Sequence, residues 1–530
     1  MHRCPFCVKS CLAFTFLLVV FLGDPVHALS NEPDLVWPGY GNQSLARLTD
    51  SPLVFSLQST STIGPNELTP LWLHSNRWGL LDSVANQVQV TAGTAGVWQP
   101  FLQGTGTQFI LDYQVIAAYP DPRNKDAAQL NTAFLRARYG PAELSFGLLP
   151  MEKGEISSSL SSGGALISRN ARPIPRVHVG LYDYVSLPLT DGVVQVRGSI
   201  AHGWLEEDRY VESPWLHEKE AYVRLNDPFE WGLSIYRGLV HAVIWSGYAQ
   251  DGSRRPSTWS DYWGVFRSAA TGSESIRDVD PDSPSRDLSD TLGIWDIGVQ
   301  LARPTFDLHA YHQHFFETGS GYSTMVLGNK WFRPQRIADG LWGVAFAPKF
   351  SRLLDSVVYE LLYTKYQGGR GHPFGQFMYY DHHIYRTGWT HYGRSIGPAL
   401  VVLDDETQIN PFEHTRLHVH HLGVKLALSD TVYLRTLGTY SRNYGTYRRN
   451  ATWAGHDNPE GVGVEVDELF LNGLVQWSFL AEVSTVQGLF GIDSLFGSLG
   501  IGVDVGEVRS DSIGFLLTIG MRDVVRNFSQ

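Results

Sequence analysis

The stretch 161–247 constrains the fold more than any other part of the chain, because its strand-like runs carry charge on one face only. Apolar residues alternate with polar or aromatic residues in 177–187, 193–200 and 220–226. A period of two residues is typical of β-strands that expose their two faces to different surroundings. Three charged residues fall on the polar faces, namely Arg197, Glu220 and Arg224. They favour a sheet with lipid on one side and a wet lumen on the other.

A closed β-barrel is the only way in which this sequence can cross a bilayer. After residue 28 no apolar run reaches the 18 residues that a spanning helix needs. The 53 glycines and the aromatic content of 12% suit one large antiparallel sheet with many turns. Period-two patterns predict strands at 52–62, 69–80, 84–98, 107–119, 130–139, 142–149, 177–187, 193–200, 220–226, 229–237, 293–303, 305–316, 340–350, 353–364, 412–428, 431–442, 462–480, 482–490, 495–505 and 511–521.

The predicted connections alternate between short turns and long segments such as 250–291, 317–339 and 365–395. Outer-membrane barrels show this asymmetry, with short periplasmic turns and long extracellular loops. The loop at 161–176 is rich in small residues and contains Arg169, Arg172 and Arg176. We expect it to plug the lumen through salt bridges to barrel acids rather than to contact a ligand directly. Arg197 and Arg224 are expected to face the same lumen.

The N-terminus has the pattern of a cleavable export signal. Arg3 and Lys9 precede the apolar run 12–22, and a small residue, Ala28, marks the expected cleavage point. We therefore divide the chain into a signal peptide at 1–28, a polar periplasmic tether or plug segment at 29–50 and a barrel at 51–530. All three cysteines lie within the signal, so disulfides and thiol chemistry are not expected in the mature chain.

The charge balance excludes one class of partner. Removing residues 1–28 takes away Arg3, Lys9 and Asp24, which leaves 39 basic and 52 acidic residues and a net charge of −13. A nucleic-acid-binding protein needs a basic surface, so no nucleic-acid partner is expected.

An ordered set of segments identifies a possible family. The runs SSGGALISRNARPIPRVHVGLYDYVSLP (161–188), VRGSIAHGWLEED (196–208), LHEKEAYVRL (216–225) and GLVHAVIWSG (238–247) come first. They are followed by HQHFFETGSGY (312–322), ADGLWGVAF (338–346), YELLYTKYQGG (359–369), YRTGWTHYGRSIGP (385–398) and HVHHLGVK (418–425). Together they resemble the Wzi-type capsule assembly family of outer-membrane proteins over roughly 160–445.

This resemblance implies a barrel of about 18 strands in the bacterial outer membrane. It also implies a lectin-like protein that assembles or retains capsular or extracellular polysaccharide, without enzymatic activity and without a cofactor. We expect a monomer whose partners are the polysaccharide and outer-membrane lipid. Some members of the family carry a helical bundle near the N-terminus, but no long 3.6-residue period occurs here before residue 150.

Aromatic and arginine-rich segments are the candidates for sugar binding. Aromatic faces stack on sugar rings, and arginine forms paired hydrogen bonds with uronate carboxylates. The same aromatic residues could instead form the interfacial girdle of a barrel, and the sequence leaves both readings open. The polysaccharide-binding candidates are Trp389, Tyr392, Arg394, Tyr440, Arg442 and Tyr444.

The histidines form clusters, but we expect hydrogen-bonded lumen or rim positions rather than a metal site, which needs three or four converging ligands. The clusters are His309, His312 and His314; His382 and His383; and His414, His418, His420 and His421. The apolar parity changes at His420 and His421, which predicts a β-bulge there.

Two alternative functions remain open at this point. A sugar-selective porin would need an open lumen. A hydrolase or acyltransferase would need a serine or paired acids beside a histidine, but no Gly-x-Ser-x-Gly motif surrounds any serine. Acidic runs such as 206–208 and 404–406 are expected to be solvated loop charges, so no catalytic residue is assigned.

Overall fold

The computed structural model describes residues 34–35, 43–44, 53–98, 109–157, 159–266, 289–317, 338–367, 378–404, 407, 409–453 and 464–525. The expected signal peptide lies outside the described residues, and so does most of 29–50. Within that segment two short strands, β1 (Asp34–Leu35) and β2 (Gln43–Ser44), pair with each other. The expected signal and domain boundaries stay predictions.

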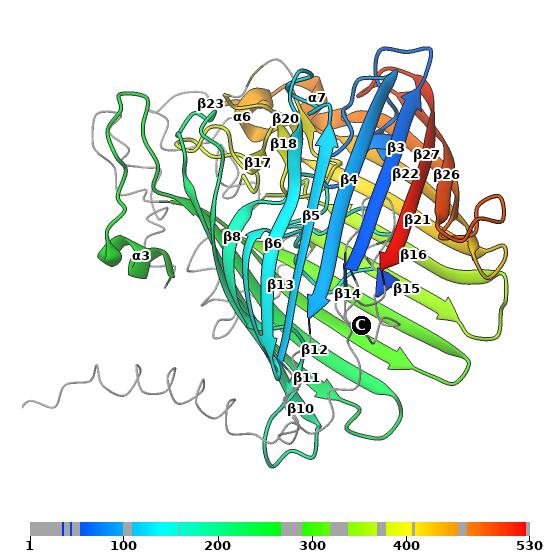
Figure 1. Cartoon of the computed structure of the whole chain (residues 1–530). Helices are drawn as coiled ribbons and strands as arrows, with labels where there is room; N and C mark the ends of the chain where they lie inside the picture. Colours follow the sequence, from blue (N-terminus) through cyan, green and yellow to red (C-terminus); the bar gives the residue numbers. More distant parts are fainter. Residues whose placement is uncertain are drawn as a thin grey trace, which may run out of the picture.

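One closed antiparallel barrel forms the body of the protein (Figure 1). Its wall strands are β3 (Leu53–Ile63), β4 (Gln87–Trp98), β5 (Phe109–Tyr119), β6 (Gln129–Tyr139), β7 (Ala142–Leu148), β8 (Pro175–Leu181), β9 (Val185–Ser186), β10 (Val194–Trp204), β11 (Trp215–Asn226), β12 (Leu233–Trp245), β13 (Ser289–Ala302), β14 (Phe306–Phe316), β15 (Gly340–Pro348), β16 (Leu354–Tyr363), β21 (Leu417–Ala427), β22 (Val432–Asn443), β25 (Leu474–Thr485), β26 (Leu495–Gly506) and β27 (Ser512–Val525). Both β8 and β9 pair with β10 and count as one strand, so the wall has the predicted 18 strands. Pairing of β27 with β3 closes it.

The remaining elements are short and lie in the connections. They are α2 (Leu71–His74), α3 (Trp259–Phe266), α6 (Tyr447–Asn450), α7 (Glu468–Asn472), β17 (Thr390–His391), β18 (Arg394–Ser395), β19 (Val402–Leu403), β20 (Phe412–His414), β23 (Ala451–Trp453) and β24 (Val464–Val466). No helix among the described residues is long and apolar enough to cross a membrane.

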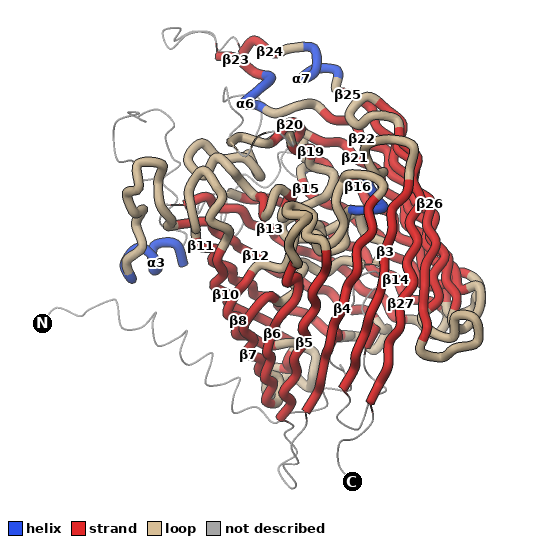
Figure 2. The backbone as a smooth tube through the Cα atoms, turned by 45° about the horizontal axis from the view of Figure 1, so that its top comes forward, coloured by secondary structure: helices blue, strands red, loops and turns tan. Residues whose placement is uncertain are grey.

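The two ends of the barrel differ as the sequence predicts. Short turns such as 303–305, 349–353 and 428–431 connect strands at one end. The long connections gather at the other end, where α6, α7 and β17–β20 also lie (Figures 1 and 2). By the usual asymmetry of outer-membrane barrels, the end with the long connections is extracellular.

The wall strands have an apolar outer face and a polar inner face. Leu135, Leu144 and Phe146 point outward and are more than half exposed, as lipid-facing side chains should be. Their neighbours on the inner face are buried and charged: Arg136 pairs with Asp112 at 2.9 Å, and Arg138 pairs with Glu143 at 2.9 Å. Such internal ion pairs satisfy charges that the bilayer could not accommodate.

The connection between β7 and β8 folds inward and fills the lumen, which confirms the predicted plug. The Ser161 hydroxyl donates to Glu360 Oε1 at 2.6 Å, and the backbone N–H of Ser162 donates to Glu360 Oε2 at 2.7 Å. The backbone N–H of Ala165 donates to Gln313 Oε1 at 2.9 Å. Because Glu360 and Gln313 lie on β16 and β14, the far wall of the barrel holds the plug in place.

Four predictions about individual elements were wrong. The predicted strand at 69–80 is instead α2 followed by irregular chain inside the lumen, where Trp72 and Leu73 are buried. The separate strands at 462–480 and 482–490 are one wall strand, β25, preceded by α7. The predicted strand at 229–237 begins only at Leu233, after a turn in which Gly232 has a φ of +70°.

The predicted bulge at His420 and His421 is also absent, since both residues pair in register with β16 and β22. The parity of the apolar residues changes for a different reason. Leu417 and Val419 face inward and are fully buried, because the plug makes the upper lumen apolar. Leu422 faces outward and is 47% exposed at the level of the membrane.

Candidate functional site

Two adjoining clefts open at the extracellular mouth of the barrel. The first, here called the tryptophan cleft, has a volume of about 600 Å³ and is lined by Trp204, Trp215, Tyr248, Arg254, Glu206 and Tyr392 among others. The second, the arginine cleft, has a volume of about 530 Å³ and includes Arg123, Arg172, Arg394, Arg509, Glu206 and Tyr392. Since Glu206 and Tyr392 line both clefts, these two residues form the shared wall between them.

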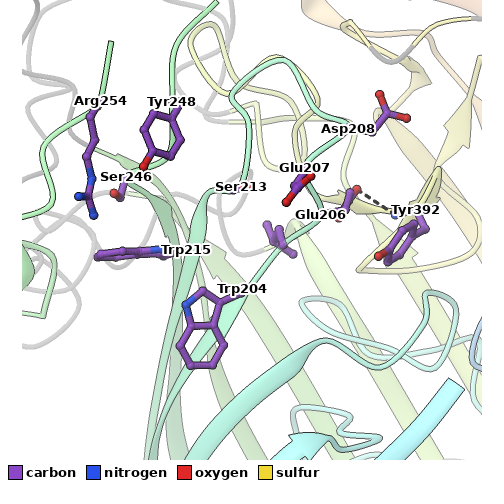
Figure 3. A pocket seen from close by; sticks show the side chains of 12 residues that line it. Trp204, Glu206, Glu207, Asp208, Ser213, Trp215, Ser246, Tyr248, Arg254 and Tyr392 are labelled. Carbon is purple, nitrogen blue, oxygen red and sulfur yellow. Dashed lines mark hydrogen bonds between the residues drawn. The ribbon is translucent and has the colours of Figure 1, made fainter. Parts of the chain in front are cut away.

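The tryptophan cleft lies on the outer side of the rim, at the upper ends of β10 and β11, because Gly203 and Leu216 beside its two tryptophans are the residues that point inward. Trp204 ends β10, Trp215 begins β11, and the two are cross-strand partners. The Trp215 indole packs edge-on against buried Trp245, with ring centroids 4.9 Å apart, which fixes its orientation. Figure 3 shows Arg254 and Tyr248 above Trp215, on the side of the cleft away from Glu207 and Asp208. The cleft therefore offers aromatic surface between a cation and two carboxylates.

A two-residue hairpin between β17 and β18 presents the ring of Tyr392. Tyr392 and Gly393 have φ values of +50° and +74°, as a type I′ turn requires. The guanidinium of Arg172 lies 4.2 Å from the centre of the Tyr392 ring, and that of Arg123 lies 5.5 Å from it. Each arginine also forms an ion pair, Arg172 with Asp121 at 3.3 Å and Arg123 with Asp208 at 3.0 Å.

Glu206 anchors this hairpin from below. It accepts hydrogen bonds from Arg209 Nη1 at 3.1 Å, from the Tyr392 backbone N–H at 3.0 Å and from His391 Nδ1. Burial alone would raise the pKa of Glu206, but Arg209 and His391 outweigh it and hold the pKa well below its usual value. Burial lowers the pKa of His391, and Arg209 supplies a permanent countercharge to Glu206.

This buried position differs from the prediction that 206–208 forms a solvated acidic run. Only Glu207 and Asp208 are exposed, whereas Glu206 is 8% exposed. The partner that buries it, His391, lies 185 positions away in the sequence.

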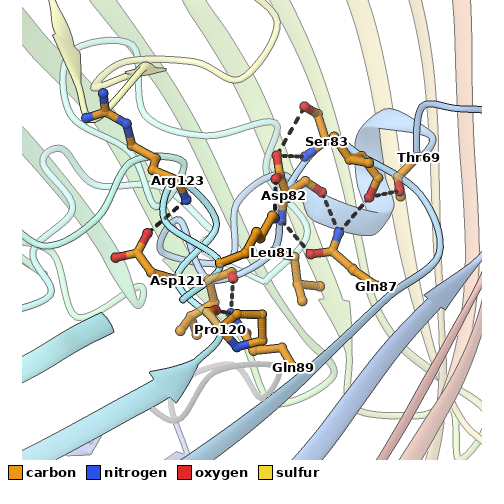
Figure 4. A network of polar contacts seen from close by, with 12 residues as sticks. Thr69, Leu81, Asp82, Ser83, Gln87, Gln89, Pro120, Asp121 and Arg123 are labelled. Carbon is orange, nitrogen blue, oxygen red and sulfur yellow. Dashed lines mark hydrogen bonds and ion pairs between the residues drawn. The ribbon is translucent and has the colours of Figure 1, made fainter. Parts of the chain in front are cut away.

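A polar network supports the other side of the arginine cleft (Figure 4). The side chain of Gln87 donates to the carbonyls of Asp82 at 2.9 Å and Val84 at 2.8 Å, and its Oε1 accepts from the Asp82 N–H at 3.1 Å. Asp121 accepts from the backbone N–H of Arg123 at 2.9 Å. These bonds fix the connections after β3 and β5, so that Asp121 faces Arg172.

The six sequence-derived polysaccharide candidates do not form one site. Tyr392 and Arg394 line the arginine cleft, where Arg394 donates to the carbonyl of Leu81. Trp389 is completely buried in the core, and Tyr444 is 6% exposed. Tyr440 and Arg442 lie on the outer face of β22, because their neighbours Thr439, Ser441 and Asn443 point into the lumen and are buried.

Sequence reasoning missed Trp204, Trp215, Tyr248 and Arg254, which line the tryptophan cleft. The signal that could have identified the first two was available: a tryptophan stands at each end of the acidic connection 205–214. Both ends of a connection between paired strands meet at the same rim of a barrel.

Each of the arginines proposed for the lumen or plug has a polar partner inside the protein. The contacts are Arg169 with Glu152 at 3.8 Å, Arg172 with Asp121 at 3.3 Å, Arg176 with Glu218 at 2.8 Å, Arg197 with Glu155 at 2.7 Å, and Arg224 Nε with Gln195 Oε1 at 2.8 Å. Arg172 differs from the others because it also lines a cleft at the mouth. Burial lowers the pKa of Arg172, partly offset by Asp121.

The clustered histidines on wall strands are split between its two faces, whereas His382, His383 and His414 lie in the connection between β16 and β21. His309 and His421 point inward and form hydrogen bonds with Tyr236 and Thr439. His312, His314, His418 and His420 alternate with buried inward residues and therefore face outward. Within the described part of the chain, no group of three or more His, Cys, Asp or Glu residues could hold a metal ion.

One buried set resembles a catalytic triad in composition but not in geometry. Ser145 Oγ lies 3.3 Å from His178 Nδ1, and Glu143 Oε1 lies 3.5 Å from the same nitrogen. A triad needs the serine and the acid on opposite nitrogens of the imidazole. All three side chains are also buried in the lumen, away from either cleft.

The fold and its mouth define a class: an outer-membrane β-barrel whose lumen is closed by its own loop and whose extracellular rim carries aromatic and arginine-lined clefts. The family model of the capsule assembly protein Wzi matches residues 87–400, which is more than half of the sequence. The chain belongs to the Wzi capsule assembly family.

One solved structure supports the fold. The chain is similar to Escherichia coli Wzi, which is described as an outer membrane protein involved in group 1 capsule assembly and as a carbohydrate-binding β-barrel. The two proteins are 12% identical, the match covers 88% of this chain and 84% of that chain, and the TM-score is 0.53. Pseudomonas aeruginosa OccK5 (OpdH) matches at 9% identity over 90% of this chain and 98% of that one, with a TM-score of 0.41. P. aeruginosa OccK2 (OpdF) matches with the same identity and coverage and a TM-score of 0.43. No curated protein matches the chain.

Proposed function

We propose that this protein binds an extracellular polysaccharide at its mouth during surface assembly of a capsule, and that it is not an enzyme. The observation that carries the proposal is the pair of adjoining clefts at the extracellular rim of a barrel whose lumen is plugged. Family membership supports a role in capsule assembly. E. coli Wzi, which has the same fold, is described as carbohydrate-binding.

The chemistry of the clefts suits a chain of sugars. Trp204 is 38% exposed and Tyr248 is 42% exposed, so both can stack against the apolar face of a sugar ring. Arg254, at the rim of the tryptophan cleft, can bind a carboxylate of an acidic sugar. Two clefts that share Tyr392 can bind neighbouring sugar units of one polysaccharide, whereas a free monosaccharide would fill only part of either cleft.

The plug distinguishes this function from that of a sugar porin. Ser161, Ser162 and Ala165 are hydrogen-bonded to the far wall, and Lys153 pairs with Glu220 lower in the lumen at 3.1 Å. A sugar would have to displace these contacts to pass. Because β27 pairs with β3 of the same chain, the barrel is complete as one polypeptide, and we propose that it acts as a monomer.

The test combines conductance with polymer binding. The purified protein in a planar bilayer should pass no steady current, and vesicles that contain it should retain capsular polysaccharide. The double variant Trp204→Ala/Trp215→Ala should bind the polymer about tenfold or more weakly, as expected for loss of central aromatic contacts. The matched control is Trp231→Ala, because Trp231 is 61% exposed in a turn at the other end of the barrel.

Two results would contradict the proposal. A steady current that small sugars block would show a porin. Equal polymer retention by the double variant and the Trp231→Ala control would show that the tryptophan cleft is not the site.

A further inference from the structure

The outer surface of β16, β21, β22 and β25 changes character with depth in a regular way. Outward side chains on paired strands form rows, and successive rows are two residues, or roughly 6.6 Å, apart along the strand. The three uppermost rows, from the extracellular end downward, contain Tyr363, His418 and Arg442; then His420, Tyr440 and Trp477; then Tyr359, Leu422 and Phe479.

These rows reproduce the profile of a membrane leaflet. The third row is apolar and exposed, with both Leu422 and Phe479 more than 40% exposed, so it lies in hydrocarbon. In the second row Tyr440 packs against Trp477 at 4.8 Å, as in an interfacial aromatic girdle. The first row is therefore at the level of the lipid headgroups.

The first row contains one permanent cation, Arg442. Arg442 and His418 are direct cross-strand partners on the outer face. Arg442 Nε donates to the carbonyl of Asn472 at 2.7 Å, which orients the guanidinium at the rim. Lys365 lies just above the row, with its amine 3.5 Å from the centre of the Tyr444 ring, and Arg442 lies 5.7 Å from the centre of that ring.

Lys365, His418, His420 and Arg442 are here called the rim patch. A carboxylate lies further along the same row, where Glu507 accepts a hydrogen bond at 2.8 Å from the backbone N–H of Val475, the cross-strand partner of Arg442. His418 is the cross-strand partner of Arg442, and its ring centroid lies 4.9 Å from that of His420. Within the described residues, neither His418 nor Arg442 forms an ion pair with a carboxylate.

We propose that the rim patch binds the phosphate of a phosphorylated glycolipid in the outer leaflet. Arginine and lysine form strong, charge-assisted hydrogen bonds with phosphate, and His418 can add a ring N–H donor. The exposed apolar third row below the patch would contact the acyl chains of the same lipid. A capsular polymer is a poorer fit, because the patch directly borders the lipid-facing apolar row of the wall.

The test uses native mass spectrometry of the full-length protein in detergent with a bis-phosphorylated lipid A. The wild-type protein should retain this lipid, and the double variant His418→Gln/Arg442→Gln should retain about tenfold less, because it loses the charge-assisted contacts. Arg442→Lys should retain most of the binding, which separates loss of charge from a folding defect. The matched control is Arg352→Gln, since Arg352 is an exposed cation in the turn 349–353 at the opposite end.

Two further arms identify the source of the phosphate. The same lipid with its phosphates removed should bind the wild-type protein as weakly as the double variant binds the phosphorylated lipid. Inorganic phosphate at millimolar concentration should not displace the lipid. Equal retention by the wild-type protein and the double variant would overturn the proposal. Retention of the dephosphorylated lipid, or full displacement by inorganic phosphate, would overturn it as well.

Discussion

At the residue scale, the mouth depends on a single buried carboxylate. Glu206 joins the connection 205–214 to the β17–β18 hairpin through Arg209, His391 and the backbone of Tyr392. Arg209 in turn donates to the carbonyls of Thr390 at 2.6 Å and Gly388 at 2.7 Å. Neutralising Glu206 would leave the guanidinium of Arg209 buried without its countercharge, which is strongly destabilising in protein interiors.

We expect Glu206→Gln to destabilise the hairpin by about 3 kcal/mol. Backbone amides in 388–395 should then exchange with deuterium roughly a hundredfold faster, because local opening determines their protection. Hydrogen–deuterium exchange mass spectrometry measures this directly. Glu207→Gln is the matched control, since Glu207 is the exposed neighbour and should leave the exchange unchanged.

The same carboxylate makes this protection depend on pH. The folded pKa of Glu206 is below its unfolded value, so its stabilising effect is complete above an unfolded pKa of about 4.3 and is lost as the pH falls toward the folded pKa. After correction for intrinsic exchange, protection of 388–395 should decrease below about pH 4 in the wild-type protein. The Glu206→Gln variant should lack this dependence, and an identical pH response in both proteins would contradict the assignment.

The sequence predicts which face of the wall a side chain occupies better than it predicts the site. Alternation places Val179 in lipid and His178 in the lumen, and the structure agrees. Trp389 and Trp204 look equivalent as aromatic residues near charged ones, yet one is fully buried and the other lines a cleft. That difference depends on contacts between connections that are nearly two hundred residues apart, and a local pattern does not contain them.

At the element scale, close backbone contact holds the plug against the wall. Gly423 on β21 faces the lumen, and a Cβ added there would lie 2.5 Å from the carbonyl oxygen of Leu160 and 2.8 Å from its Cβ. His421, on the same strand, holds that carbonyl through its Nε2 at 2.8 Å. A side chain at position 423 would therefore compete with the plug for the same space.

We expect Gly423→Val to displace the plug and to convert a silent barrel into one that conducts, because valine suits the strand but not the contact with Leu160. Single-channel recording in planar bilayers measures the change. The matched control is Gly438→Val on the next strand, where an added Cβ would make an ordinary contact, 3.5 Å from Phe479. If the Gly423→Val variant still passes no current and proteases still do not cleave its plug, then contacts other than the one with Leu160 hold the plug in place.

The predicted strand at 69–80 was wrong because the two faces of that segment do not differ. Around 69–80, side chains on both sides are buried, because the segment runs inside the lumen between the wall and the plug. Leu73 packs against Gly502 and Gly514 of the wall, positions where a Cβ would come within about 3 Å of it. A period-two pattern distinguishes the lipid-facing side chains of a strand from its lumen-facing ones. It does not distinguish a wall strand from a segment that the wall encloses.

At the scale of the whole molecule, two features oppose tight binding of an acidic polymer to one barrel. The chain carries a net charge of −12 at pH 7, which repels polyanions at long range. The arginines of the clefts are partly neutralised already, since Arg123 pairs with Asp208 and Arg172 pairs with Asp121. Each barrel should therefore bind a few sugars weakly, and retention of a capsule should depend on many barrels that bind the same polysaccharide molecule.

We therefore expect affinity to rise with polymer length and with the density of the protein in the membrane. Linked weak sites can gain a factor of 10²–10⁴ in affinity without new contacts. Vesicles with sparse and dense protein, titrated with single repeat units and with long polymer, separate the two contributions. Repeat units should bind equally weakly to both, whereas the polymer should be retained strongly only on dense vesicles. The Trp204→Ala/Trp215→Ala variant should lose retention at both densities. Density-independent polymer affinity would instead mean that the clefts of one barrel form a single tight site, and the charge argument would then be wrong.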